Sequence, residues 1–221
     1  MPRHDGRQNY APNGGLWGPA LVDPRVRDMP RADLCSRDSR VLDSSYRLLY
    51  DPGMPSCAEP FITRSISLLS DEYLNKLTRS LSAVTDADVW WRPNEASNSI
   101  GNLLLHLRGN VTQWILGGVG QRPFERTRPE EFSSRGGATA QELLHDLSTT
   151  VHQACEVIAR QTGDSLLERR QIQGYDVSVL EAVYHVVEHF SMHTGQIILL
   201  AKARTGSDLA LWQPPPPFSR T

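Results

Sequence analysis

Residues 178–206 read SVLEAVYHVVEHFSMHTGQIILLAKARTG, a pattern typical of one long amphipathic helix. Ser178 and Glu181 have the spacing of a capping box, which satisfies backbone N–H groups in the first turn. Apolar side chains then recur every three or four residues, so they share one face of the helix. They are Val179, Val183, Val186, Val187, Phe190, Ile197, Ile198 and Ala201. Gly206 predicts the helix end, because glycine adopts the left-handed conformation of a helix C-terminus without steric cost.

Three stretches upstream carry the same helical period. They cover approximately residues 61–84, 98–118 and 139–163. The second begins at Asn98 and Ser99, both favourable N-caps. The third begins with Thr139 and Glu142, a second pair spaced as a capping box. The sequence therefore predicts four long amphipathic helices.

The connections between these helices are polar and contain many turn-forming residues. Residues 85–88 are a turn-like cluster, residues 119–137 predict a long loop, and residues 164–177 predict an irregular connection. No strand pattern separates the helices, so the expected fold is all-α, a four-helix bundle. The longer connections after the second and third helices allow topologies other than a simple up-and-down arrangement.

The two ends of the chain differ in composition from the helical part. Residues 1–57 hold seven of the 15 prolines and no persistent apolar period, which predicts a disordered N-terminal extension. The alternatives are a partner-binding arm, or translation starting at Met54 so that residues 1–53 are upstream sequence. The predicted bundle covers residues 58–211, and residues 212–221 form a Pro-rich tail.

Composition narrows the possible functions. The chain has 221 residues and a formal charge of -2, which argues against a nucleic-acid partner, since such proteins are usually basic. The longest purely apolar run, residues 197–201, is far shorter than the roughly 20 residues that cross a bilayer, so no membrane association is expected. No secretory signal is recognisable, and the three cysteines include no CxxC pair. These features favour a cytoplasmic protein.

Histidines are unevenly placed along the predicted helices. His185, His189 and His193 follow one another at four-residue steps, so neighbouring rings project from nearly one face. His106 lies in the apolar run Leu103-Leu104-Leu105-His106 of the second helix, where an imidazole needs a partner. Two histidines four residues apart can bind one metal ion, and a third from another helix can complete the site. The alternatives are solvated surface histidines and a hydrogen-bonded core histidine.

Two segments resemble the DinB-like superfamily, which includes the YfiT-type thiol transferases. They are residues 185–198, HVVEHFSMHTGQII, and residues 90–107, WWRPNEASNSIGNLLLHL. Residues 172–177, IQGYDV, are similar to an uncharacterised branch of that superfamily. The resemblance implies a four-helix bundle that binds a divalent metal ion through His106, His189 and His193. His185 is not a usual ligand in such proteins and is expected beside the site.

The resemblance implies a metal-dependent hydrolase or a low-molecular-weight-thiol S-transferase. Three neutral imidazoles leave the full charge of the ion available to a water or a thiolate. Zinc, nickel, manganese and iron all suit three histidines, with zinc slightly favoured. The expected partners are a small-molecule substrate and a low-molecular-weight thiol, and a homodimer is plausible. The alternative is a non-catalytic, metal-stabilised bundle that binds a partner.

Five residues are candidates for the surroundings of the ion. They are Asn110, Tyr175, His185, Glu188 and Gln196. Asn110 and Gln196 have amide groups that could orient water or substrate. Glu188 is either a general base or a solvated helix residue.

Overall fold

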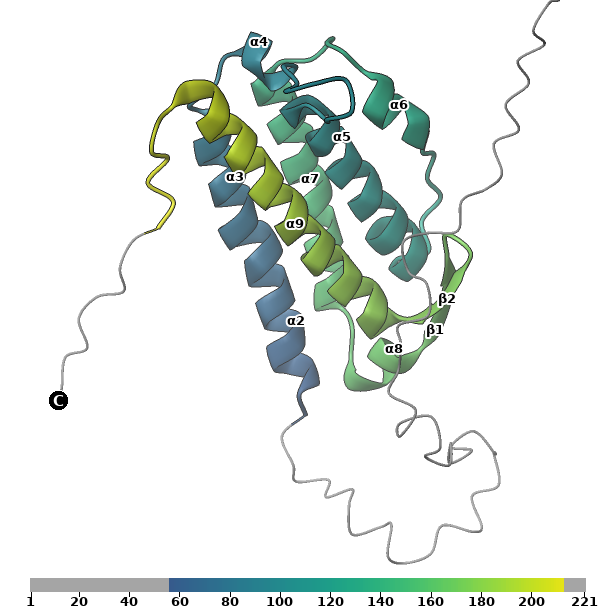
Figure 1. The fold of residues 1–221 in the computed structure, drawn as a ribbon. Coiled ribbons are helices and arrows are strands. Elements are labelled where there is room, and N and C mark those ends of the chain that lie inside the picture. Colours follow the sequence, from purple (N-terminus) through teal and green to yellow (C-terminus); the bar gives the residue numbers. More distant parts are fainter. Residues whose placement is uncertain (1–55, 213–221) are drawn as a thin grey trace, which may run out of the picture. The chain divides into compact units, whose positions relative to one another are not determined.

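The computed structural model describes residues 56–212, and it shows four long helical segments (Figure 1). The first segment consists of α2 (Ala58–Ser67), the π-helical segment η2 (Leu68–Tyr73) and α3 (Leu74–Leu81). The others are α5 (Ile100–Val111) with the π-helical segment η3 (Thr112–Val119), α7 (Ala140–Ala159) and α9 (Val179–Thr205). The predicted four-helix bundle is confirmed. The predicted N-terminal extension, the alternative start at Met54 and the Pro-rich tail lie almost entirely outside the described residues.

The predicted helix ends rest on specific hydrogen bonds. In the capping box of α7, the Thr139 N–H donates to Glu142 Oε2 at 2.8 Å, and in that of α9 the Ser178 N–H donates to Glu181 Oε2 at 2.6 Å. Both serine or threonine side chains also cap the third residue of their helix. Gly206 ends α9 in the left-handed conformation, with φ 65°. The sequence therefore determines both ends of α9 through local chemistry.

The long connection after the second helix decides the topology. Residues 120–139, here called the crossover segment, return along α5 in the opposite direction. Arg126 bonds to Gln113, Glu131 bonds to His106, and the Ser134 carbonyl accepts from Asn102 near the start of α5. As a result α7 runs parallel to α5, while α9 runs antiparallel to both (Figure 1). The bundle is thus not a simple up-and-down arrangement. The long connections in the sequence allow such other topologies.

The connections contain more regular structure than the sequence predicts. The turn-like cluster includes α4 (Asp86–Val89), the predicted loop 119–137 includes α6 (Arg128–Ser133), and the irregular connection holds α8 (Gly163–Leu167) and a hairpin. The hairpin pairs β1 (Arg169–Ile172) with β2 (Tyr175–Ser178) in antiparallel register. The prediction that no strands separate the helices is therefore wrong. Four residues are the shortest run in which an alternation can be recognised, and β1 begins with three polar residues in succession and shows none.

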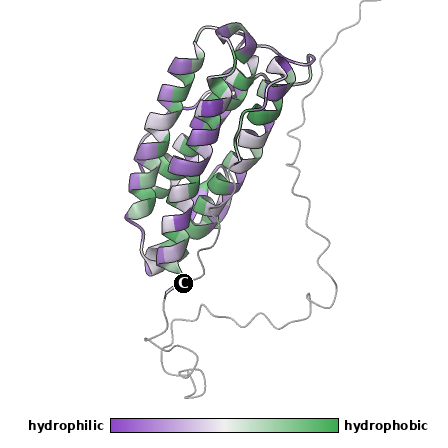
Figure 2. Ribbon diagram, turned by 90° about the vertical axis from the view of Figure 1, so that its left-hand side faces the viewer, coloured by the Kyte–Doolittle hydropathy of each residue, from purple (hydrophilic) through white to green (hydrophobic). Residues whose placement is uncertain are grey.

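The facing sides of the four helical segments form one apolar core. Figure 2 shows hydrophobic residues concentrated on the inner sides of the helices. Core side chains from each segment are completely buried, including Leu77, Leu107, Leu147, Val183 and Phe190. Within residues 56–212, no helix combines the length and the apolar character that crossing a membrane requires.

Candidate metal centre

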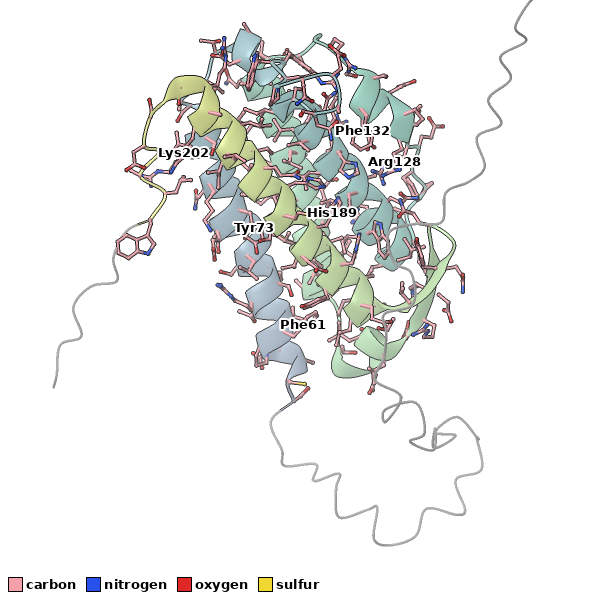
Figure 3. The ribbon with its side chains drawn as sticks, viewed as in Figure 1. Phe61, Tyr73, Arg128, Phe132, His189 and Lys202 are labelled. Carbon is pink, nitrogen blue, oxygen red and sulfur yellow. The ribbon has the colours of Figure 1, made fainter. Side chains whose placement is uncertain are left out.

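Three histidine rings meet between α5 and α9. His106 comes from α5, and His189 and His193 come from successive turns of α9. One ring nitrogen of each lies within 4.8 Å of the others, and His106 Nε2 is 3.0 Å from His189 Nε2. Figure 3 shows His189 on α9. The structure thus brings together all three residues that the resemblance implies as ligands, here called the three-histidine cluster.

A buried ion pair from the crossover segment contacts the cluster. His106 Nδ1–H donates to Glu131 Oε2 at 2.8 Å. Arg126 donates to both oxygens of the same carboxylate, from Nε to Oε1 at 2.6 Å and from Nη2 to Oε2 at 2.9 Å. The Arg126 and Glu131 side chains are only 5% and 9% exposed. One nitrogen of His106 is therefore bound to a fixed carboxylate, and Nε2 is directed at the other two histidines.

His193 has one ring nitrogen satisfied and one without a partner. Its Nδ1–H donates to Gln196 Oε1 at 2.7 Å. Its Nε2 is buried and has no hydrogen-bond partner among the described residues. An orphaned buried nitrogen is unfavourable unless a ligand uses its lone pair. The donor set therefore fits a metal ion, because one of the buried atoms that lack a partner within residues 56–212 is a ring nitrogen of the three-histidine cluster.

Burial in the cluster favours the neutral rings of His189 and His193. Burial, reinforced by the charges that neighbouring histidines would carry, lowers the pKa of His189 to about 3. Burial also lowers the pKa of His193 and of His185. Burial alone would raise the pKa of Glu131, but its hydrogen bonds with His106 and Arg126 outweigh this effect and lower it. Neutral imidazoles are the form that binds a metal ion.

The expected neighbour residues divide into two groups. His185 stacks on His189 at 5.4 Å between ring centroids, and its Nε2 lies 3.3 Å from Asn110 Nδ2. The indole of Trp114 lies 4.0 Å from the His185 ring, and the ring of Tyr175 lies 6.5 Å beyond that indole. These residues thus form a continuous layer next to the cluster.

The two remaining candidates lie on the outer side of α9. Glu188 is exposed, as the solvated interpretation of this residue requires. Gln196 is also exposed as a residue, yet its side-chain oxygen holds His193. Of these two, only Gln196 therefore has a contact that orients the three-histidine cluster.

Comparison with known proteins agrees with this fold. A family model described as "Protein of unknown function (DUF1572)" matches residues 56–213. The chain belongs to the DUF1572 family. A conserved protein from Enterococcus faecalis has a similar structure, with a TM-score of 0.55 and 17% identity over 66% of this chain and 97% of that one. A DinB-like protein from Bacillus cereus ATCC 10987 has a TM-score of 0.53 and 16% identity over 66% of this chain and 91% of that one.

The fold of this DUF1572 protein is DinB-like, as the sequence resemblance implies. At such low identity the two solved structures show a common fold and nothing about activity. No curated protein matches the chain. What this DUF1572 member does must therefore be argued from its own side chains.

Sequence reasoning missed two residues of this DUF1572 site, Arg126 and Glu131. Both lie in a segment rich in charged residues, where Glu125, Glu130 and Glu131 are equivalent by residue type. Neither helical period nor motif spacing distinguishes Glu131 from the others. The only available signal was the buried position expected for His106, which requires a polar partner from another element.

Proposed function

We propose that this protein binds one divalent metal ion through His106, His189 and His193. The observation that carries the proposal is the three-histidine cluster, in which the buried Nε2 of His193 has no partner from the described part of the chain. Zinc is the favoured ion, because it accepts three imidazoles readily and leaves a further position open. When bound, such an ion supplies an electrophilic centre for a water or a thiolate.

We further propose that the bound ion serves a metal-dependent hydrolase or a low-molecular-weight-thiol S-transferase. The described residues form no metal-binding group that includes a cysteine, so a thiol would have to come from a cosubstrate. Two buried polar atoms next to His185, Asn110 Oδ1 and Trp114 Nε1, also lack partners in the described region. We propose that this acceptor and this donor orient a small polar substrate beside the ion.

The proposal is tested first by metal content. We expect the full chain, purified without chelator, to carry close to one equivalent of metal. His106→Ala and His193→Ala should both lose it, because each removes one of the three ligands. His145→Ala is the matched control, since this residue is exposed on α7. Stoichiometric metal in both cluster variants would refute the proposed site.

Turnover is tested separately with two probes. The metal-loaded protein is incubated with an activated ester, and in parallel with an aryl halide and a low-molecular-weight thiol. Ester cleavage that requires His189 supports the hydrolase, and thiol consumption that requires His189 supports the transferase. His189 is half-buried, whereas the other two histidines are buried, so a small substrate would reach the cluster from the side of His189.

A non-catalytic role of the metal is the alternative. His106 and His193 are only 5% and 8% exposed, which is also suitable for a structural ion. A structural ion stabilises the folded state through its binding energy, so chelation should lower the melting temperature strongly. Large destabilisation by chelator, combined with no turnover of either probe, would favour this alternative.

A further inference from the structure

The polar side of α5 faces the crossover segment along its whole length. Asn102, His106 and Gly109 of α5 and Gln113 at the start of η3 are separated by four, three and four residues, so they lie on one face of this helical segment. Asn102 Nδ2 donates to the backbone carbonyls of Glu131 and Ser134, both at 2.9 Å. This completely buried amide fixes α6 against α5 at the level of His106.

The Arg126–Glu131 pair occupies a space that α5 leaves open. A Cβ atom at Gly109 would overlap Glu131 Oε1 and would lie 2.7 Å from Arg126 Nε. The absence of a side chain at this position therefore lets the pair lie flat against the helix. Arg126 also donates to Gln113 Oε1 at 2.6 Å, and Gln173 of the hairpin donates to the same oxygen at 2.6 Å. The pair is thus held from several sides.

We infer that Glu131 is a positioning residue for the metal centre and that Arg126 holds it in place. The inference rests on the proposed function, and it adds the crossover segment to the site. His106 Nδ1 lies 2.8 Å from Glu131 Oε2 and 3.3 Å from Arg126 Nη2, and the shorter contact is to a carboxylate that can only accept, so the proton of His106 stays on Nδ1. Its Nε2 then presents a lone pair toward His189 and His193. Carboxylates that hold the second nitrogen of a ligating histidine in this way fix its tautomer and its orientation.

The first test reads the tautomer of His106 directly and needs no metal. Nitrogen NMR of the chelator-treated full chain gives the protonation of each ring nitrogen, and a His106→Gln variant assigns the signals. We expect His106 to be protonated on Nδ1 alone. In Glu131→Gln we expect a mixture of tautomers, because an amide can either donate or accept. An unchanged single tautomer in Glu131→Gln would overturn the inference.

The second test measures zinc affinity by competition with a chromophoric chelator. We expect Glu131→Gln to raise the dissociation constant roughly 10- to 100-fold, as is typical when a carboxylate behind a ligating histidine is lost. Glu130→Gln is the matched control, since this neighbouring carboxylate is exposed, and it should bind zinc like the original protein. Unchanged affinity in Glu131→Gln would overturn the positioning role even if the tautomer shifts.

A third variant keeps both charged residues and tests the geometry. Gly109→Ala should displace the Arg126–Glu131 pair and weaken zinc binding in the same direction as Glu131→Gln. Gly195→Ala on α9 is its control, because a Cβ there has none of the described neighbouring residues within 4 Å. Full zinc affinity in Gly109→Ala with an undisturbed His106 signal would contradict the inference. If the original protein binds no zinc, the metal proposal fails, and the His106 tautomer alone decides the role of Glu131.

Discussion

Acid should destabilise the metal-free protein through His189. An unfolded histidine takes up a proton as the pH falls below about 6.5, its ordinary pKa. In the folded protein, burial and the neighbouring histidines lower the pKa of His189 to about 3. Between these two values the unfolded state binds the proton and the folded state does not, so lowering the pH favours unfolding. The stability that depends on the neutral His189 ring is therefore complete above pH 6.5, and it is lost progressively as the pH falls toward 3.

The size of the effect follows from the two pKa values. A pH of 5.0 lies about 1.5 units below the pKa of His189 in the unfolded chain. This difference corresponds to about 2 kcal/mol of lost stability. Solvent screening of this half-buried ring reduces the expected loss to about 1–2 kcal/mol. For a folded part of this size, that loss lowers the melting temperature by roughly 2–8 °C. Burial also lowers the pKa of His185 and of His193, which adds loss in the same direction.

Urea unfolding of the chelator-treated full chain at pH 7.5 and pH 5.0 measures this loss. His189→Gln removes the titrating group, so we expect the variant to lose about 1–2 kcal/mol less than the original protein over the same interval. His145→Gln, an exposed substitution on α7, should lose as much as the original protein. An equal loss in His189→Gln and in the original protein would refute the assignment of this pH dependence to His189.

Two further predictions concern the scaffold, and urea unfolding measures both. Ser178→Ala removes the side-chain cap of α9 and should cost about 1 kcal/mol, whereas Ser191→Ala on the exposed face of α9 should change stability by less than about 0.5 kcal/mol. Gly101→Ala places a Cβ 2.8 Å from the Trp90 ring and should cost about 1–3 kcal/mol, although alanine favours helices. Gly195→Ala, whose Cβ would contact no neighbour in the described region, should instead be neutral or stabilising by up to about 1 kcal/mol. A loss in Gly195→Ala equal to that in Gly101→Ala would contradict the steric explanation.

The long helices could be predicted from the sequence because their signals are local. The capping boxes at Thr139 and Ser178 require only residues three positions apart, and the glycine stop at Gly206 requires one residue. The pair His189 and His193 is equally local, since four residues on a helix bring both rings to one face. Such features can be recognised without knowledge of the tertiary structure. The long helices and the histidine pair on α9 were therefore predictable.

The short elements and the ion pair could not be predicted, because their stability comes from tertiary contacts. The helix α6 is only six residues long and has a single buried residue, Glu131. No helical period can be recognised in so short and polar a segment. It is held by Asn102 and His106, which lie 29 and 25 residues from Glu131 in the chain. His106 itself stood out through its place in an apolar run, and its role as a ligand came from the family resemblance.

The helix α5 has two buried faces, one apolar and one polar. This difference explains why the helix could be predicted from the sequence and the ion pair could not. Leu103, Leu104 and Leu107 face the apolar core, whereas Asn102 and His106 are equally buried but bond to the crossover segment. Hydrophobic periodicity detects only the apolar face, so the polar face resembles an interruption of the pattern. Buried polar groups require partners, and a helix that buries both faces must have another layer of chain over the polar one. In this protein the crossover segment is the layer that covers the polar face of α5, and it places the Glu131 carboxylate against His106.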